Sequence, residues 1–489
     1  MRSSVLFTSL AIFSILPPLS SAAEPAAERT AEPAAERAAA ELDARLASLF
    51  VGDQGLTADK IAAKALETSY DVRAAQAELG AASARVTQAL WAYVPRLSGS
   101  ARYVRLSPLD AVSLGNLVTV GDGPAGPIAA GTTLNRTPLA FPVLLNQTSF
   151  QLSLTVPLTD YFLRLGDAED AAKAGEAAAR YAQAISAERA GAEARLLFYG
   201  WVRAKLQAVV AAQALEQARH HAEDAARLVS AGSASSADQI SAEARVAQAE
   251  LLVLRVEDLG ARLGDQLQIV MHDPQAQLQI GEDVRGELPA ELELVPLAEL
   301  RRQAREQRPE LQALLAQRSA ILSQANIARA GMLPRIDAFA DATVANPSAR
   351  AFPQSDNFVG TWDLGAQLSF TFTDLPQAMA ERDAALAKAE AALARISQAE
   401  DGIDAEVMAA QQEMREARAA IASTQRQLVA AEAAYGVRRS LFSAGMAKSV
   451  ELTDADTALT EARLAAVDAR IDLRVGKTKL LRALGSRAR

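Results

Sequence analysis

Long stretches of the chain place apolar residues at helical spacing, with few Gly or Pro residues to interrupt them. Near the C-terminus a seven-residue repeat of apolar residues runs through Leu452, Leu459, Ala466, Leu473 and Leu480. A companion row of small residues runs beside it through Ala455, Ala462, Ala469 and Gly476. A row of large residues beside a row of small ones lets two helices approach closely, as in a coiled coil. The pattern predicts very long paired helices over about 160–229, 236–271, 377–442 and 450–484.

Four short segments instead alternate apolar and polar residues with a period of two. They cover about 96–104, 149–157, 335–343 and 362–373. This period is typical of a strand with one apolar face and one wet face. Trp362 and Phe372 bracket an apolar row of about the length that crosses a bilayer. A small soluble sheet packed on the helices is the alternative, and the N-terminus described below favours the membrane interpretation.

The two halves of the chain echo each other, which indicates an internal duplication. Both Val229–Gly232 and Phe442–Gly445 have Ser-Ala-Gly before a long helix, and Trp91–Leu97 echoes Ala330–Ile336 as a strand entry. We expect a first repeat over 57–271, a connector rich in Gly and Pro over 272–296, and a second repeat over 297–485. The inserts at about 105–148 and 344–361 are expected to be loops.

The N-terminus has the pattern of a cleaved secretory signal over residues 1–23. Arg2 supplies the positive start, an apolar run ends at Pro17 and Pro18, and small residues follow. The apolar run is short for a membrane anchor. Residues 24–56 begin rich in Ala, Glu and Pro, and we expect a mobile periplasmic tether or a frayed helix there.

Composition narrows the possible chemistry. The net charge is −9 and cysteine is absent, so the sequence predicts no disulfide, no thiol nucleophile and no nucleic-acid partner. Of the three histidines, His220 and His221 are neighbours on a helix whose side chains diverge, and His272 lies at a helix end. We therefore expect no metal site, no cofactor and no enzymatic activity.

The strands also predict an oligomer. Four strands cannot close a barrel, and an open edge in lipid leaves backbone groups unpaired at several kcal/mol each. Membrane barrels need at least about eight strands. The expected fold is therefore mainly α with a transmembrane β-barrel portion. Each chain is expected to contribute a duplicated repeat, four strands and very long coiled-coil helices.

With these features in order, the chain resembles the TolC family of outer-membrane efflux proteins over about 57–484. The resemblance rests on the duplicated architecture, on the pattern from Phe442–Gly445 through Ser449–Leu452 to Asp454, and on the ending Leu480–Gly485. Two features depart from many relatives. Ala precedes each turn glycine where a larger aliphatic residue is common, and the lipidated cysteine is missing.

The resemblance implies a homotrimer with a twelve-stranded barrel and a helical periplasmic tunnel, located in the outer membrane. It would be the passive exit duct of a tripartite efflux or type I secretion system. The helix turns would contact a periplasmic adaptor, which is joined to an inner-membrane transporter. By position, the adaptor-contacting residues are Ala231, Gly232, Ser233, Ala444, Gly445 and Met446. Glu451, Asp454 and Asp238 match an acidic ring that forms the periplasmic gate.

Each of these assignments has a competing interpretation. Acids at a helix start also cap the helix and favour its dipole, so Glu451, Asp454 and Asp238 could serve only that purpose. The long helices alone would also suit a soluble periplasmic coiled-coil adaptor or scaffold. Such an adaptor would be expected to have one helical hairpin flanked by compact β-domains, whereas this chain has two hairpins and amphipathic strands.

Overall fold

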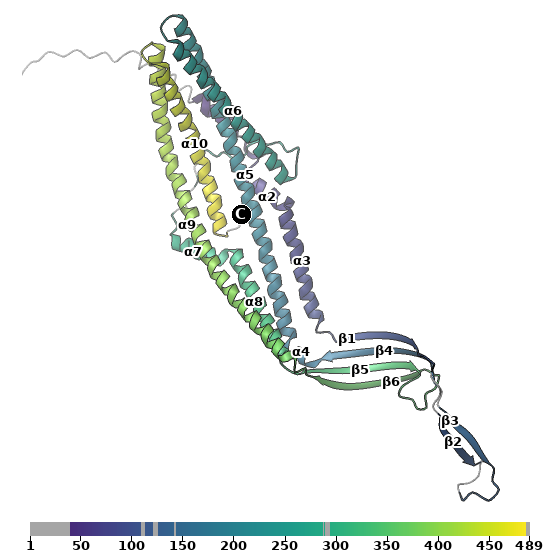
Figure 1. The fold of residues 1–489 in the computed structure, drawn as a ribbon. Coiled ribbons are helices and arrows are strands. Elements are labelled where there is room, and N and C mark those ends of the chain that lie inside the picture. Colours follow the sequence, from purple (N-terminus) through teal and green to yellow (C-terminus); the bar gives the residue numbers. More distant parts are fainter. Residues whose placement is uncertain are drawn as a thin grey trace, which may run out of the picture. The chain divides into compact units, whose positions relative to one another are not determined.

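The computed structural model describes residues 40–108, 113–120, 126–140, 143–286, 288 and 294–485 (Figure 1). The expected signal peptide, 1–23, and residues 24–39 of the expected tether lie outside the described residues. The described chain forms two compact units. One contains 40–68, 190–297 and 408–482, and the other contains 69–189, 298–407 and 483–485.

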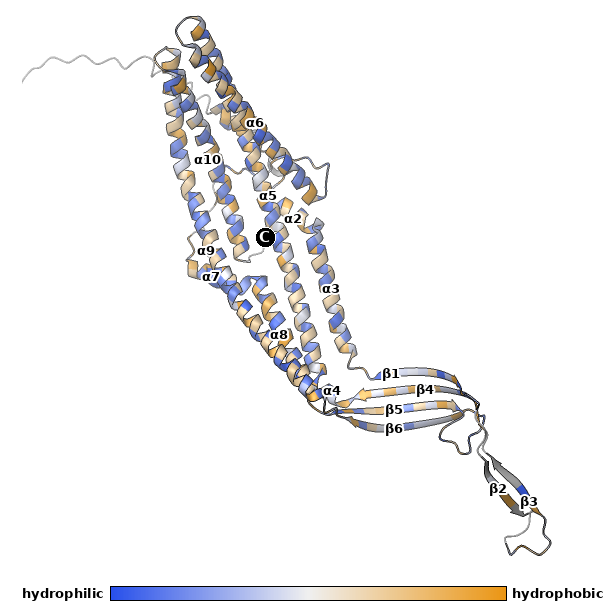
Figure 2. Ribbon diagram, viewed as in Figure 1, coloured by the Kyte–Doolittle hydropathy of each residue, from blue (hydrophilic) through white to orange (hydrophobic). Residues whose placement is uncertain are grey.

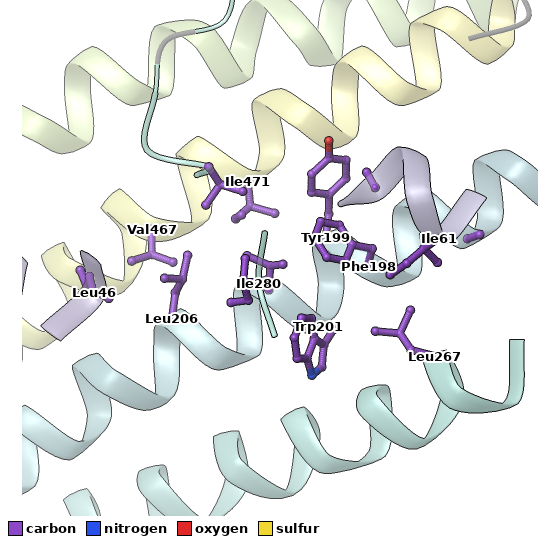
Figure 3. Close-up of a cluster of buried hydrophobic side chains, with 14 of the residues drawn as sticks. Leu46, Ile61, Phe198, Tyr199, Trp201, Leu206, Leu267, Ile280, Val467 and Ile471 are labelled. Carbon is purple, nitrogen blue, oxygen red and sulfur yellow. The ribbon is translucent and has the colours of Figure 1, made fainter. Parts of the chain in front are cut away.

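The first unit is a helical bundle with one main hydrophobic core. It contains α2 (Ala58–Thr68), α6 (Ser236–Met271), α10 (Ser449–Ala483) and the C-terminal parts of α5 (Leu165–Ser230) and α9 (Asp374–Ser443). Phe198 and Trp201 of α5 are almost fully buried, and Leu267 of α6 and Ile471 of α10 pack in the same cluster (Figure 3). This core therefore ties both helical hairpins together inside one chain.

Helix pairs approach closely where the sequence places small residues. A Cβ added at Gly476 of α10 would lie 3.2 Å from the Cα of Met414 in α9. A Cβ at Gly260 of α6 would lie 3.7 Å from the Ala204 Cβ in α5. Hydrophobic and hydrophilic residues interleave along α5 and α9 (Figure 2), which run for 66 and 70 residues. The prediction of very long, closely packed helices is confirmed.

The expectation of a mobile tether up to residue 56 is wrong for its last part. Residues 40–47 are helical, and Leu42 and Leu46 are buried in the main core. A 3-10 helix, η1 (Gly52–Gln54), follows, and Phe50 and Leu56 each bridge to Ile280 of the connector. The apolar spacing over 42–50 decides the structure here, because buried leucines offset the entropy of ordering the chain.

The connector between the repeats forms part of this same core. Ile280 and Val284 are buried, and the Gly281 N–H donates to the Leu56 carbonyl at 2.7 Å. A Cβ added at Gly55 would come within 2.4 Å of the Gly281 backbone. The two segments thus meet at a distance that only glycine permits.

The second unit combines helices with an antiparallel sheet. Its helices are α3 (Tyr70–Trp91), α4 (Leu158–Leu163), α7 (Leu297–Gln307) and α8 (Pro309–Ala330), with the N-terminal parts of α5 and α9. The sheet has the order β1-β4-β5-β6, formed by Arg96–Arg105, Asn146–Pro157, Arg335–Asn346 and Val359–Ser369. β1 and β6 are its two edges. Across the described ranges, no helix combines the length and the apolar character needed to cross a membrane.

The four predicted strands are present, but the sheet differs from expectation in two places. The long insert contains two further strands, β2 (Ser113–Val120) and β3 (Leu134–Ala140), and among the described residues these pair only with each other. Gly115 and Pro138 interrupt the alternation there, which hides the hairpin in the sequence. β6 ends at Ser369, so Phe372 lies beyond the strand that it was expected to close.

Candidate functional site

The turns of the two helical hairpins have the same backbone geometry. Gly232 and Gly445 adopt φ angles of 74° and 72°, in the left-handed region. Each turn closes with the same pair of hydrogen bonds. In the first turn the Ser233 N–H donates to the Leu228 carbonyl, and in the second the Met446 N–H donates to the Leu441 carbonyl, both at 2.8 Å. In each turn the glycine N–H also donates to a carbonyl three residues earlier. This is a Schellman motif, in which glycine avoids a Cβ clash. The duplication extends to atomic detail here.

The two turns line one open groove of about 480 Å³. Of the six expected adaptor-contacting residues, Gly232, Ser233, Gly445 and Met446 line this groove. Ala231 and Ala444 are exposed beside it. The Met446 side chain is 67% exposed. The fold therefore brings the two predicted turns together into one surface, which we call the tip groove.

Asp238 caps two helices at once. Its Oδ2 accepts hydrogen bonds from the N–H and the hydroxyl of Ser235, and its own N–H donates to Ser235 Oγ, which completes a capping box at α6. Its Oδ1 accepts from the N–H of Ser449 at 3.2 Å, at the start of α10. These hydrogen bonds, those from Ser235 first, lower the pKa of Asp238. The carboxylate is therefore held ionised between the two hairpins.

Glu451 and Asp454 differ in their surroundings. The Glu451 carboxylate forms an ion pair with Arg438 of α9. Asp454 is exposed, and within the described ranges its carboxylate has no hydrogen bond or ion pair. Both residues lie in the first two turns of α10. Of the three predicted gate acids, Asp454 alone thus leaves its full charge to solvent.

A buried polar cluster links the hairpins close to the tip groove, and the sequence did not reveal it. The His221 Nε2 lies 3.0 Å from Ser449 Oγ, and the His221 ring packs edge-on against Phe442 with centroids 4.7 Å apart. Burial lowers the pKa of His221, although nearby carboxylates, Asp456 among them, oppose the shift. The imidazole is therefore neutral near pH 7, and its Nδ1 has no hydrogen-bond partner among the described residues.

The strongest contact of this cluster is a buried ion pair between α6 and α10. Arg245 Nε lies 2.8 Å from Asp456 Oδ2, with both side chains less than 10% exposed. The same guanidinium donates to Thr460 Oγ1 at 3.3 Å. Burial raises the pKa of Asp456, and Arg245 opposes the shift. Seven residues further along α10, Arg463 is also buried and bonds Gln213 Oε1 at 3.1 Å.

One signal could have located these residues. Asp456 and Arg463 are seven residues apart and directly flank the predicted leucine row of α10. A charge at that repeat position faces the neighbouring helix and not solvent. By contrast, His220 is exposed, and its Nδ1 lies 3.8 Å from a carboxylate oxygen of Glu223. Within the part of the chain that the structure describes, no three His, Asp or Glu side chains converge as metal ligands.

Comparisons with known proteins agree with these features. Residues 300–486 match the family model described as outer membrane efflux protein. No curated protein matches the chain in sequence.

Solved structures match the fold over most of the chain. CusC superimposes with a TM-score of 0.70 at 19% identity, covering 90% of this chain and 94% of CusC. The MtrE outer membrane channel of Neisseria gonorrhoeae gives a TM-score of 0.69 at 17% identity, covering 88% of this chain and 89% of MtrE. VceC of Vibrio cholerae gives a TM-score of 0.69 at 16% identity, covering 88% of this chain and 96% of VceC.

At these identities the structural matches establish the fold, which is that of outer-membrane channels, and the family model supports the family independently. Channels of this kind are passive conduits and not enzymes. Residues 300–486 therefore match the outer membrane efflux protein family, and most of the chain shares the fold of the outer-membrane channels CusC and MtrE.

Proposed function

We propose that this chain is the exit duct of a tripartite efflux or type I secretion system. Copies of the chain, three by the family resemblance, would combine their strands into one barrel in the outer membrane. The helices would form the periplasmic tunnel. The observation that supports this proposal most is a described sheet of four strands with two open edges, in a chain whose residues 300–486 match the outer membrane efflux protein model.

The sheet has the surface chemistry that this role needs. On β4 the exposed apolar side chains are Phe150, Leu152 and Leu154, separated by Gln151 and Ser153. On β6, Trp362 and Leu364 are 75% and 74% exposed. Water disfavours such a surface, whereas a lipid bilayer accepts it. One face would therefore meet lipid and the other face the water-filled lumen.

For the tip groove we propose contact with a periplasmic adaptor that is joined to an inner-membrane transporter. Exposed Met446 offers a flexible apolar side chain, which suits a protein contact. Met446→Glu should reduce the amount of adaptor recovered with the affinity-captured channel. The amount of channel in outer-membrane fractions should stay at the wild-type value, because the substitution leaves the strands untouched. Unchanged adaptor recovery would contradict this role.

For the gate we propose that Asp454 contributes most of the free charge and that Glu451 contributes less, because Arg438 pairs with it. Rotational symmetry would bring these acids from each copy into one ring, which attracts cations and repels anions. Asp238 would act mainly by holding the starts of α6 and α10 together. This assignment separates a charge role from a positioning role among the three predicted acids.

The test is single-channel conductance of the purified protein in planar bilayers. Replacing both Glu451 and Asp454 with Ala should raise resting conductance and reduce cation preference. The double variant of Glu257 and Asp258 to Ala is a matched control, because it removes two exposed acids of α6 that lie far along the chain from its turn. Wild-type conductance and selectivity in the gate variant would leave these acids only a capping role. Recovery of the protein in the soluble periplasmic fraction would defeat the duct itself.

A further inference from the structure

The sheet offers its own template for how one copy joins the next. Within the chain, the first hairpin (β1 and β4) and the second hairpin (β5 and β6) are joined side by side by the β4–β5 ladder. This ladder runs without a break from Thr148 opposite Asn346 to Pro157 opposite Asp337. Since the two hairpins are copies of one unit, the same junction can recur between β6 of one chain and β1 of another.

At the end of the β4–β5 ladder that lies next to the helices, side-chain contacts also connect the two strands. Thr159 Oγ1 accepts a hydrogen bond from the Ile336 N–H at 2.7 Å and lies 3.3 Å from the Ile336 carbonyl oxygen. The Asp160 carboxylate lies 3.8 Å from the Arg335 guanidinium. One Thr-Asp pair after β4 thus holds the start of β5 through two hydrogen bonds to the Ile336 backbone and one ion pair.

The register of the two hairpins identifies the counterparts of these residues. Arg96 lies opposite Thr155 in the first hairpin, and Arg335 lies opposite Ser369 in the second. Arg96 therefore corresponds to Arg335, and both follow a proline. Thr155 therefore corresponds to Ser369. Four residues further along each chain segment, Thr159 corresponds to Thr373, and the next residue, Asp160, corresponds to Asp374. The residue types are identical at both positions.

In the second repeat, Thr373 and Asp374 have no strand beside them among the described residues with which to form the same contacts. Thr373 and Asp374 are exposed, as is Arg96 at the opposite edge of the sheet. Across the described ranges, none of these three side chains has a hydrogen bond or an ion pair. Arg335 also has Asp337 as a partner at 2.9 Å, but the counterpart of Asp337 beside Arg96 is Ser98. The two edges thus present complementary, unpaired groups.

We propose that β6 of one copy pairs with β1 of the next in the register of β4 with β5, and that Thr373 and Asp374 of the first copy hold Leu97 and Arg96 of the second. This inference rests on the proposed pooling of strands and adds its register and its fastening residues. Ser153 lies opposite Asp341 within the chain, so Gln367 should lie opposite the second copy's Arg102. Likewise, Thr371 should lie opposite the second copy's Ser98.

The proposed junction also accounts for the early end of β6. Within the chain β4 is paired up to Pro157, two residues beyond its last partner in β1, because β5 continues the ladder. Among the described strands, β6 has β5 on one side and no strand on the other, and it ends at Ser369. Pairing with a second copy would extend it over Phe370 and Thr371. The sequence alternation, which continues to 373, then matches the strand of the assembly.

Disulfide cross-linking tests the register directly, because the native chain contains no cysteine. Residues directly opposite in an antiparallel pair have Cα atoms about 4.5–5.5 Å apart, within the range of a disulfide. The variant carrying Arg102→Cys and Gln367→Cys should give covalent multimers in oxidised outer-membrane fractions. They should appear on non-reducing denaturing gels and collapse to single chains on reduction.

Two further variants serve as controls. Ser153→Cys with Asp341→Cys repeats the same geometry inside one chain, so it should form a disulfide without multimers. Arg102→Cys with Leu368→Cys moves one cysteine by one residue to the other face of the strand, so it should cross-link weakly. No multimers from the 102–367 pair, or equal multimers from the 102–368 pair, would overturn the register. Normal conductance of that same protein would then leave the proposed duct standing, whereas loss of both conductance and multimers would count against the duct.

Charge exchange tests the fastening pair. Arg96→Asp alone and Asp374→Arg alone should each lower the temperature at which the oligomer dissociates in detergent. The variant that carries both exchanges should recover most of that loss, because the attraction is restored with reversed polarity. Asp374 also lies in the first turn of α9, and a role limited to the helix dipole would leave the double variant no better than Asp374→Arg. That result would overturn the ion pair.

Discussion

His221 is a titratable side chain buried between the two hairpins, and its protonation should change the stability of the bundle near the tip groove. Burial holds the pKa of His221 below its ordinary value of 6.5. Unfolded chains therefore bind this proton more readily than folded ones as the pH falls below 6.5, so the free energy of unfolding decreases there. Asp456, whose pKa is raised, acts with the opposite sign and at lower pH.

We therefore expect the unfolding temperature to fall between about pH 7.5 and about pH 5.5, where histidine titrates. In His221→Gln this fall should be smaller, because glutamine has no proton to gain. His220→Gln is the matched control, since the neighbouring His220 is exposed, and it should behave as the wild type does. An equal fall in all three proteins would show that other groups govern the acid response.

The turn glycines make a second prediction at the scale of single residues. Gly445 has a positive φ of 72° with open space around it, so Gly445→Ala meets backbone strain and no steric clash. We expect a loss of about 1 kcal/mol in the free energy of unfolding. Gly402→Ala inside α9 also enters open space but lacks the positive φ, so it should gain about 0.5–1 kcal/mol. Denaturant titration of both variants checks the difference in sign.

Between whole helices, the dominant polar contact is the buried pair of Arg245 on α6 and Asp456 on α10. Asp456→Ala leaves a buried cation without its partner, and we expect a loss of about 3–5 kcal/mol. The exposed pair of Arg219 and Glu250 is the control, and Glu250→Ala should cost about 0–1 kcal/mol.

A double variant identifies the source of that cost. Replacing Arg245 with Met and Asp456 with Leu removes both charges, and it should restore most of the stability, because the penalty belongs to the unpaired charge. Thermal unfolding of the purified protein in detergent measures each variant. Similar losses for the Asp456 and Glu250 variants would contradict a buried role for the pair.

The elements that local pattern determines could be predicted from the sequence. The alternation through Leu152 and Leu154 located β4, because a strand places every second residue on one face. The small residue at Gly476 indicated a close helix pair, and Met414 does lie against it. Gly232 and Gly445 marked the turns, because both backbones need positive φ.

Elements that depend on distant partners could not be predicted in this way. Residues 40–47 appeared mobile by composition, yet Leu42 and Leu46 bury against a core assembled from remote segments. The partners of Asp456 and Arg463, which are Arg245 and Gln213, could not be assigned, because they are far away in the sequence. Of the gate acids, Asp238 has the sequence signature of a capping box, since Ser235 lies three residues before it.

At the scale of the whole chain, the two repeats differ mainly in the connection inside each β-hairpin. The first connection carries the β2–β3 ribbon, whereas the second passes from β5 to β6 in a short loop. Exchanging residues 106–145 for the short connection 347–358 should leave membrane insertion and conductance unchanged, because β2 and β3 pair only with each other within the part of the chain that the structure describes. Loss of conductance, with normal protein levels in the outer membrane, would show that the ribbon is required.

The same ribbon gives the molecule a practical use. Leu117, Val118 and Leu134 are about half exposed within it. The strand pairs of the sheet β1-β4-β5-β6 form without any contribution from β2 or β3. An epitope tag or fluorophore attachment sequence spliced between β2 and β3 would thus be displayed apart from the conducting parts. Antibody labelling of intact cells could then report which side of the envelope carries this ribbon, one label for each subunit.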